Sequence, residues 1–467
     1  MVFSSLIFLF LFLPLNLILY YSTKNATWRN WVLIVFSLFF YGWGEPIWIS
    51  LMIFSAFVDY INALFIDKYK GTKWAKIGIV STLIINLSLL ATFKYDVFIV
   101  DNVNALLGTH FKAPGFGLPI GISFYTFQSI SYVVDVYRGE VKAQKNYFRF
   151  LMFVSLYHQL VAGPIVRYSH IANEIDSRKE TLSDFSKGIT RFCFGLFKKV
   201  VIANIAAVLV AKYMDSNIAD LSTGGAWFGL IMYAIQIYFD FSGYSDMAIG
   251  LGWMYGFHYH ENFKYPYTAT SITDFWRRWH ISLGTFFKDY LYIPLGGNKK
   301  RVYLNLFIVW FLTGMWHGAS WNFIFWGLYF FVFISLEKLF LQKLLDKLPR
   351  FFSHFYALLI IIPGWVIFYF TDTHKLAAYF GKLFSFGSGH LWNMELTNDL
   401  TSNLFWLIAV IICCVPFYQR VHHLFENRFR KPIYFEVASI VLSFFFLFLS
   451  VALLVGKSYN PFIYFRF

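Results

Sequence analysis

Charged residues and cysteine are both scarce in this chain of 467 residues. Asp, Glu, Lys and Arg together make up 14% of the sequence, whereas an ordinary soluble domain has about 25%. Hydrophobic residues reach 58%, with 59 phenylalanines, and so little charge cannot cover the surface of a water-soluble protein of this size. The composition therefore excludes a soluble enzyme, a disordered chain and a fibrous repeat, and it predicts a protein that crosses a membrane several times.

Several common site patterns are missing as well. Cys193, Cys413 and Cys414 lie in apolar surroundings and are odd in number, so we expect no disulfide framework. The segment His258–Glu261 has metal-ligand residue types, but no further ligand cluster follows at a known spacing, and we expect no metal. A dinucleotide fingerprint, a P-loop and a serine nucleophile elbow are also absent from the sequence.

Eleven apolar runs are candidates for bilayer-crossing helices, each of which needs about 20 residues. The runs are 3–21, 31–44, 47–66, 77–93, 118–137, 200–213, 224–254, 302–336, 354–371, 401–418 and 437–456. The first lacks the basic start and the cleavage site of a signal peptide, so we expect an uncleaved span. We predict a single all-α polytopic membrane domain over 1–467, with about 11 transmembrane helices and additional re-entrant or interfacial helices.

Two apolar segments do not fit one straight span. Residues 302–336 contain no Asp, Glu, Lys or Arg over 35 positions, and as one helix they would be about 52 Å long, too long for a bilayer. We therefore predict a break near Gly314, Gly318 and Asn322. Segment 150–164 is apolar but short, and we expect it to be re-entrant.

The net charge of +14 comes from Lys and Arg in short clusters between apolar runs. Such clusters are typical of cytoplasmic loops, so the charge indicates a lipid bilayer rather than nucleic acid as the partner. The clusters lie at 68–76, 138–149 and 420–431. Placing them in the cytoplasm puts the N-terminus and the 94–112 and 372–400 loops outside.

Polar residues in so apolar a chain are costly and mark candidate sites. The first is DFWRRWHIS at 274–282. At helical spacing its aromatic residues and His280 share one face and its charged residues share the other, with Asp274 and Arg278 as an i,i+4 pair. An interfacial amphipathic helix explains the charges, whereas His280 on the aromatic face is either functional or a hydrogen-bonded core histidine.

The second candidate site is GMWHGASWN at 314–322. His317 is the only classically titratable residue other than tyrosine in the run 302–336, and the small residues around it leave room for a substrate. A buried imidazole stays neutral, which is the form that a general base needs. The alternative is a helix-packing histidine bonded to a neighbouring carbonyl.

Two further segments combine polar residues with other features. Asp240 and Asp246 are six positions apart, which does not place them on one helical face, so we expect a structural network with Ser242, Tyr244 and Ser245 rather than a catalytic pair. In PLGGNKKR at 294–301, glycines followed by basic residues including Lys299 could receive phosphates of a cofactor. A turn that ends in positive-inside residues explains that segment equally well.

With these residues in place, the chain resembles the membrane-bound O-acyltransferase (MBOAT) family, in particular its bacterial alginate O-acetyltransferase branch. The resemblance covers nearly the whole chain, and one departure is Tyr157-His158, where Phe-Pro is expected. The matching stretches are GLPIGISFYTFQSISYVVDVYRG at 117–139, QLVAGPIVRY at 159–168, FDFSGYSDMAIG at 239–250, ENFKYPY at 261–267, DFWRRWHISL, YIPLGGN, GMWHGASWNF and SYNPFIYFRF at 458–467.

The resemblance implies a ring of tilted helices around a thinned, funnelled centre, with a catalytic core at about 113–336. It implies that the histidine at the base of the funnel is His317 and that the second is His280. The implied activity is transfer of an acetyl group from a cytosolic thioester, acetyl-CoA, across a bacterial cell membrane. The product is O-acetylated extracytoplasmic polysaccharide, made through a separate exported acyltransferase and the export machinery, with no permanently bound cofactor.

The resemblance also implies roles for single residues. His317 is expected to be the general base, and His280 to orient the reactants or polarise the carbonyl. The residues expected to bind donor or substrate are Arg277, Arg278, Trp279, Lys299, Trp316 and Asn322, and those expected to form a structural polar network are Asp240, Asp246 and Asp274. Other readings are acyl transfer to peptidoglycan, to teichoic acid as D-alanine or to a lipid, a lipid or sugar transporter, and a non-catalytic scaffold of an export complex.

Overall fold

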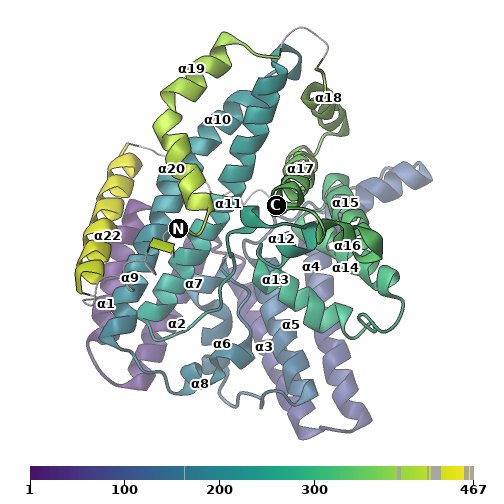
Figure 1. Cartoon of the computed structure of the whole chain (residues 1–467). Helices are drawn as coiled ribbons and strands as arrows, with labels where there is room; N and C mark the ends of the chain where they lie inside the picture. The colour runs from purple at the N-terminus through teal and green to yellow at the C-terminus, as the bar shows by residue number, and fades with distance from the viewer. Residues whose placement is uncertain (162, 387–390, 418–419, 422–432, 457–461, 463–467) are drawn as a thin grey trace.

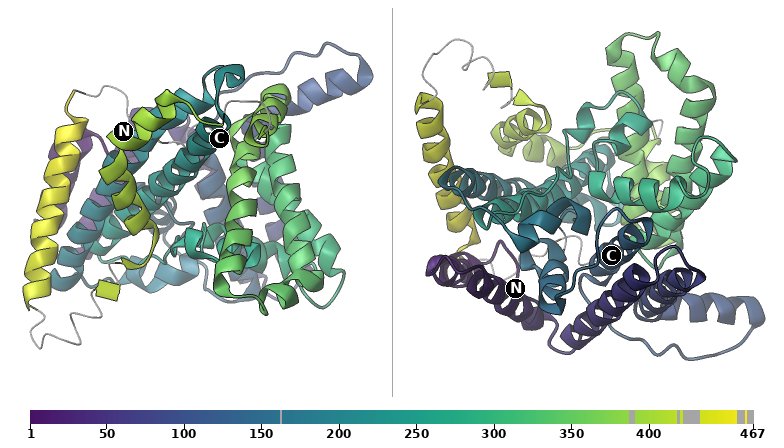
Figure 2. Two further views of the ribbon diagram at one scale, coloured as in Figure 1. Left: turned by 45° about the horizontal axis from the view of Figure 1, so that its top comes forward. Right: turned by 90° about the horizontal axis from the view of Figure 1, so that it is seen from below.

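The computed structural model describes residues 1–161, 163–386, 391–417, 420–421, 433–456 and 462, and for 433–436 the backbone alone. Every regular element within these residues is a helix. In the views of Figures 1 and 2, α22 lies at one edge and the group α14–α17 at the opposite edge, with α9 and α11 between them. The predicted all-α class is confirmed.

The described residues of the first part of the chain form eight α-helices, of which α5 is buried against α3, α4, α6 and α8. Asn25 begins α2 by accepting hydrogen bonds from the backbone N–H of Thr27 and Trp28, as N-cap residues do. Helix α5 is buried along most of its length, so it belongs to the core. The bounds are α1 (Leu13–Tyr21), α2 (Ala26–Gly44), α3 (Ile49–Lys68), α4 (Lys73–Leu107), α5 (Ile122–Arg138), α6 (Tyr147–Ser155), α7 (Tyr157–Leu160) and α8 (Tyr168–Asp176).

The middle of the molecule is a tightly packed pair of long helical stretches. One is α9 (Leu182–Phe197), a π-helical turn and α10 (Asn204–Met214), and the other is α11 (Thr223–Met254). A Cβ atom added to Gly195 would lie 2.6 Å from the Gly243 carbonyl oxygen. Glycine is therefore needed there for the two backbones to approach, as at many interfaces between membrane helices.

The short helices α12 and α13 lie at the centre of the molecule, and the helices from α14 to α22 follow them in the chain. The segment 272–287, which contains α12, His280 and α13, contacts four other helices. Phe275 packs on Trp365, Trp276 on Trp326, His280 on Phe241 and Phe286 on Phe127. The remaining bounds are α12 (Ile272–Trp276), α13 (Ile281–Phe287), α14 (Val302–His317), α15 (Trp321–Leu336), α16 (Gln342–Leu345), α17 (Arg350–Tyr369), α18 (Thr373–Leu383), α19 (Met394–Ser402), α20 (Leu404–Cys414) and α22 (Ile433–Leu454).

The predicted number of about eleven spans is not confirmed. Among the described residues, six helices are long and apolar enough to cross a membrane, or seven if α19 and α20, which meet at 67°, form one broken span. Helix α14 has only 16 residues, and a straight span needs about 20. The run 302–336 does break as predicted, because α14 ends at His317 and α15 begins at Trp321.

The basic loops of the described residues meet at one end of the molecule. An added Cβ at Gly139 would lie 2.6 Å from the Lys70 ammonium, and the Tyr60 hydroxyl donates to the Lys145 carbonyl at 2.7 Å. Helices α18 and α19 lie at the opposite end (Figure 1). The clusters at 68–76 and 138–149 therefore lie together, and the predicted orientation stays a prediction. Most of 94–112, expected as a loop, belongs to α4, and most of the third cluster, 422–431, lies outside the described residues.

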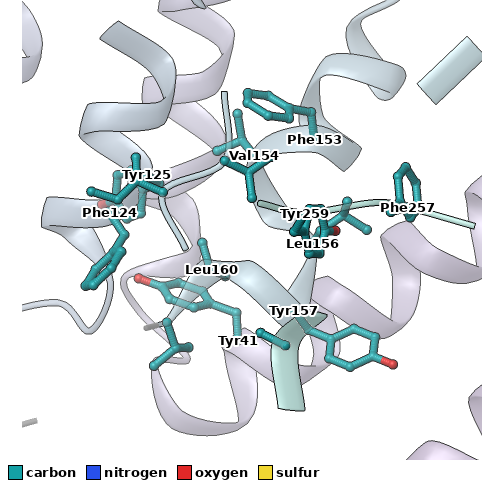
Figure 3. Packing of buried hydrophobic residues seen from close by; sticks show 14 of the residues in the cluster. Tyr41, Phe124, Tyr125, Phe153, Val154, Leu156, Tyr157, Leu160, Phe257 and Tyr259 are labelled. Carbon is teal, nitrogen blue, oxygen red and sulfur yellow. The ribbon is translucent and has the colours of Figure 1, made fainter. Parts of the chain in front are cut away.

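Segment 150–164 contains the end of α6 and all of α7, both buried, with residue 162 outside the described part. That it is re-entrant stays a prediction. Tyr157 is fully buried and packs edge-on against Phe12 with ring centroids 5.2 Å apart. His158 Nδ1 lies 2.6 Å from the Tyr259 hydroxyl. Figure 3 shows Tyr157 and Tyr259 within this cluster. The Tyr157-His158 departure is therefore accommodated by packing and by hydrogen bonds, which include that of the Tyr157 hydroxyl to the Tyr255 hydroxyl at 3.1 Å.

Candidate active site

His317 is the last residue of α14 and lies in an aromatic enclosure. Its ring meets Trp326, Trp316 and Phe368 edge-on, at centroid distances of 4.9, 5.0 and 5.2 Å. Gly318 follows in an extended conformation and ends the helix. His317 is 6% exposed. The break in the run 302–336 therefore places a buried imidazole in the interior of the protein.

A small cavity opens beside this imidazole. Its volume is about 100 Å³, and it lies between α4, the segment 118–124 and the end of α14. The residues lining it include Lys94, Gly121, Ser123, Phe124, Trp316 and His317. A space of this size has room for an acyl group of a few atoms, and His317 forms part of its wall.

His280 does not lie within a helix, so the predicted continuous amphipathic helix through this segment is wrong. α12 ends at Trp276 and α13 begins at Ile281. His280 has φ +44°, a left-handed conformation that interrupts a right-handed helix. The Ile281 N–H bonds to the Asn262 carbonyl at 2.9 Å. This contact with a distant loop holds the turn and directs His280 into the interior.

The side chain of Asn262 defines the hydrogen-bonding state of His280. Asn262 Oδ1 accepts the Ser282 backbone N–H at 3.1 Å, so this atom is the acceptor end of the amide. The same oxygen lies 3.2 Å from His280 Nδ1. His280 therefore donates through Nδ1, and a neutral ring then carries its lone pair on Nε2.

Trp316 joins the two histidines. Its ring lies 5.8 Å from the His280 ring and 5.0 Å from the His317 ring, measured between centroids. His280 and His317 are 37 positions apart in the sequence (317 − 280). The fold thus brings together the two histidines and the tryptophan that the sequence singled out.

The other predicted binding residues have different surroundings. Arg277 and Lys299 are exposed, and Arg278 pairs with Asp274 at 2.8 Å as the i,i+4 spacing predicts. Trp279 packs against Trp365 with ring centroids 4.9 Å apart.

Asn322 is also used in packing. Its amide donates to the carbonyl oxygens of Ile367 and Phe368 at 3.1 and 3.3 Å. The Phe368 ring in turn packs on His317, so Asn322 secures one wall of the aromatic enclosure.

The two aspartates of α11 are paired with cations rather than with hydroxyls. Asp246 lies 2.8 Å from Arg191 and 2.5 Å from Lys198, and Asp240 pairs with Lys199 in the core. Within the described part of the chain, neither carboxylate bonds to Ser242, Tyr244 or Ser245, so that part of the prediction is wrong. These cations lie on α9 and on the π-helical turn that follows it. The adjacent residues Lys198 and Lys199 in an apolar run were the sequence feature that could have predicted the pairing.

Sequence reasoning missed two further polar residues near the centre. Glu337 caps α12, because its carboxylate accepts the Ile272 and Thr273 N–H groups at 2.6 and 2.8 Å. Lys94 donates to the Trp316 carbonyl at 2.5 Å. Both are charged residues within or beside apolar stretches, a pattern that marks candidate sites in membrane proteins.

A larger hollow lies at the end opposite the basic loops. Its volume is about 1200 Å³, and its lining includes Tyr233, Phe323, Tyr369, Asp372, Lys375 and Lys382. The Phe323 ring packs on Phe368 with ring centroids 5.0 Å apart, and Phe368 packs on His317. The hollow therefore comes within two aromatic side chains of His317.

The helices and the enclosed histidines define a polytopic membrane protein with a buried imidazole site. The model of the family "MBOAT, membrane-bound O-acyltransferase family" matches residues 142–373. The chain belongs to this family and is an O-acyltransferase.

Relatives extend the similarity to the whole chain. A probable alginate O-acetylase AlgI of Pseudomonas putida is 39% identical, covering 100% of both chains. The protein of the same name from Pseudomonas syringae is 43% identical over 92% of this chain and 83% of its own. A peptidoglycan O-acetyltransferase of Helicobacter pylori is 31% identical over 100% of this chain and 98% of its own.

Proposed function

We propose that this chain is an O-acetyltransferase of a bacterial cell membrane. It passes an acetyl group from a cytosolic thioester, acetyl-CoA, to a hydroxyl acceptor on the outer side, and the acetyl group ends on an extracytoplasmic polysaccharide. The observation that carries the proposal is the pair His280 and His317, whose rings both contact Trp316. The similarity to alginate O-acetylases supports the acetyl group and the polymer.

His317 acts as the general base in the proposed reaction. Its imidazole takes the proton of the acceptor hydroxyl, whose oxygen then attacks the thioester carbonyl carbon. A C–O bond forms, the C–S bond breaks, and CoA leaves as a thiolate that takes up a proton. The aromatic rings around His317 keep the imidazole neutral until it accepts the proton, because burial disfavours a charge.

His280 orients the reactants. Because its Nδ1–H is directed to Asn262, a neutral His280 offers only an acceptor at Nε2. This favours a hydrogen bond from an O–H or N–H of a reactant over polarisation of the carbonyl, which needs a donor.

Donor binding is proposed at the end with the basic loops. Arg277 and Lys299 are exposed and are the proposed contacts of the CoA phosphates, whereas Arg278 is already paired with Asp274. The hollow at the opposite end is the proposed place where the acetyl group passes to an exported or membrane-anchored acyltransferase partner and the export machinery.

The test uses purified protein in nanodiscs with acetyl-CoA labelled in its acetyl group. Wild-type protein is expected to release free CoA, and His317→Ala to lower the rate by at least about 100-fold, the usual contribution of a general base. His280→Ala should also lower it. His258→Ala is the matched control, since His258 is exposed and bonds to Glu174. A folded His317→Ala protein with wild-type turnover would contradict the mechanism.

Peptidoglycan is a second acceptor to examine, because the Helicobacter pylori relative named for it matches nearly the full length of both chains. Cells that lack this chain and cells that express it are compared for ester-linked acetate in the exopolysaccharide and in peptidoglycan. Ester-linked acetate that appears only in peptidoglycan would identify peptidoglycan, rather than exopolysaccharide, as the acceptor polymer. The proposed acyl transfer itself would still hold.

A further inference from the structure

Helix α4 carries a lysine that lines the cavity beside His317. Lys94 is 21 positions beyond the start of α4 at Lys73 (94 − 73), or about 31 Å along the helix from the basic loops. This distance is about the thickness of the hydrocarbon core of a bilayer. Lys94 turns toward the protein, where it bonds to the Trp316 carbonyl, and a charged side chain that an apolar helix directs into the protein is a candidate functional residue. The proposed mechanism does not use this residue.

Lys94 and its neighbour hold the last turn of α14. The Lys94 ammonium donates to the Trp316 carbonyl at 2.5 Å, and the Tyr95 hydroxyl donates to the Met315 carbonyl at 2.5 Å. The last four carbonyl groups of a helix have no partner within the helix. Two consecutive residues of α4 therefore bond to two consecutive carbonyls of the turn that ends in His317.

The ammonium also belongs to the cavity beside His317. Lys94 lines that cavity together with His317, and its nitrogen lies 3.4 Å from Ser123 Oγ. It also lies 5.8 Å from the centre of the Trp316 ring. A cation at a helix C-terminus is favourable because the carbonyl dipoles point toward it. Tyr95 already supplies a neutral hydrogen bond to this turn. The charged bond from Lys94 therefore does more than complete the hydrogen bonding at the end of the helix.

We propose that Lys94 is a positioning residue for His317: it holds the C-terminal turn of α14 so that the imidazole faces the cavity in which the acyl group is transferred. The inference rests on the proposed acetyltransferase function. The charged bond to the Trp316 carbonyl sets the backbone immediately before His317, and loss of that bond lets the ring turn away from the reacting hydroxyl.

The kinetic test compares four variants in nanodiscs by CoA release. Lys94→Met keeps the length of the side chain and removes its charge and donors, and we expect kcat to fall about 100-fold, as a small misplacement of a reacting group does. The KM for acetyl-CoA should stay within about threefold, because donor binding is not altered. Lys94→Arg should recover much of the loss, and Tyr95→Phe should lower kcat only several-fold. Lys112→Met is the matched control, an exposed lysine that follows the end of α4.

A second measurement does not depend on turnover. Diethyl pyrocarbonate modifies histidine rings, and mass spectrometry of the peptides gives the rate at each position. In Lys94→Met we expect the rate at His317 to rise severalfold while the rate at the exposed His258 stays as in the wild type. If Lys94→Met does not fold, Lys94→Gln replaces it in both measurements, with the same expectations.

The outcomes separate this proposal from the proposed function. If wild-type protein releases no CoA and binds no acetyl-CoA, the acetyltransferase assignment fails, and the His317 modification rate still decides the role of Lys94. A folded Lys94 variant with wild-type kcat and an unchanged His317 rate would overturn the proposal. So would a loss in Lys94→Met that comes with an equal loss of thermal stability and is not recovered in Lys94→Arg.

Discussion

Replacing Asn262 by Ala is the sharpest perturbation of the site, because one oxygen atom serves three donors. Asn262 Oδ1 accepts from the Ser282 backbone N–H at 3.1 Å and from the Ser282 hydroxyl at 2.9 Å, and it lies 3.2 Å from His280 Nδ1. The side chain is 1% exposed, so water does not readily replace it. The variant removes the partner of all three groups at once.

The magnitude follows from these contacts. A buried donor that loses its partner costs about 1–3 kcal/mol. Three donors lose their acceptor, because the Ile165 N–H at 3.0 Å donates to the Ser282 hydroxyl oxygen and does not replace the partner of the Ser282 O–H. We therefore expect a loss of roughly 3–9 kcal/mol in stability. His280 also loses the bond that sets its tautomer, and we expect kcat to fall by about 100-fold.

The assay is CoA release in nanodiscs together with thermal unfolding in detergent. Asn262→Asp keeps an acceptor oxygen. At a pH where the new carboxyl group is protonated, and therefore neutral, this variant should retain more activity than Asn262→Ala. Asn173→Ala is the control, because Asn173 is exposed on α8. Wild-type turnover in a folded Asn262→Ala protein would refute the reasoning that Asn262 sets the state of His280.

Two other predictions concern the helices around the site. Gly195→Ala should destabilise the protein by about 1–3 kcal/mol or more, because the new Cβ would lie 2.6 Å from the Gly243 carbonyl oxygen. Gly381→Ala is the control and should leave stability unchanged, because a Cβ at Gly381 has nothing within 4 Å. Equal thermal midpoints of the two variants would contradict this prediction. Backbone N–H groups at the start of α18 hold the pKa of Asp372 below its ordinary value of 3.8. The cap is therefore fully present above that value and is lost as the pH falls through the lowered pKa, so amide exchange of the first α18 turn should speed up in acid, and Asp372→Asn should weaken that dependence.

Prediction from the sequence succeeded where the signal was local. The break of the run 302–336 followed from its length, since no bilayer accommodates an unbroken helix of 35 residues, and small residues marked where it occurs. The Asp274–Arg278 pair followed from helical spacing alone and is present at 2.8 Å. His280 and His317 were singled out because polar groups in apolar segments are costly. Both are buried, as that reasoning predicts, and their roles in catalysis stay predictions.

Prediction failed where a distant segment decides the conformation. The segment around His280 has a helical pattern, yet Asn262 and Glu337 bind its backbone from other parts of the chain, and the helix breaks between them. Asp246 was expected to bond to nearby hydroxyls, but Arg191 lies 55 positions away in the sequence and 2.8 Å away in space. The predicted number of about eleven spans stays unconfirmed, because runs such as the part of 302–336 in α14 are apolar but, at 16 residues, shorter than a straight span.

The sequence by itself determined that this protein is a helical membrane protein, that one long run breaks beside His317, and that two histidines are its candidate reactive groups. These features depend on composition and on spacing along one helix, which are local properties. Only the tertiary structure decided that Trp316 joins the two histidines, that Asn262 orients His280, and that Lys94, 222 positions before its partner, bonds to the turn that ends in His317. Contacts between distant segments arise from helix packing, and no periodicity in the sequence encodes them.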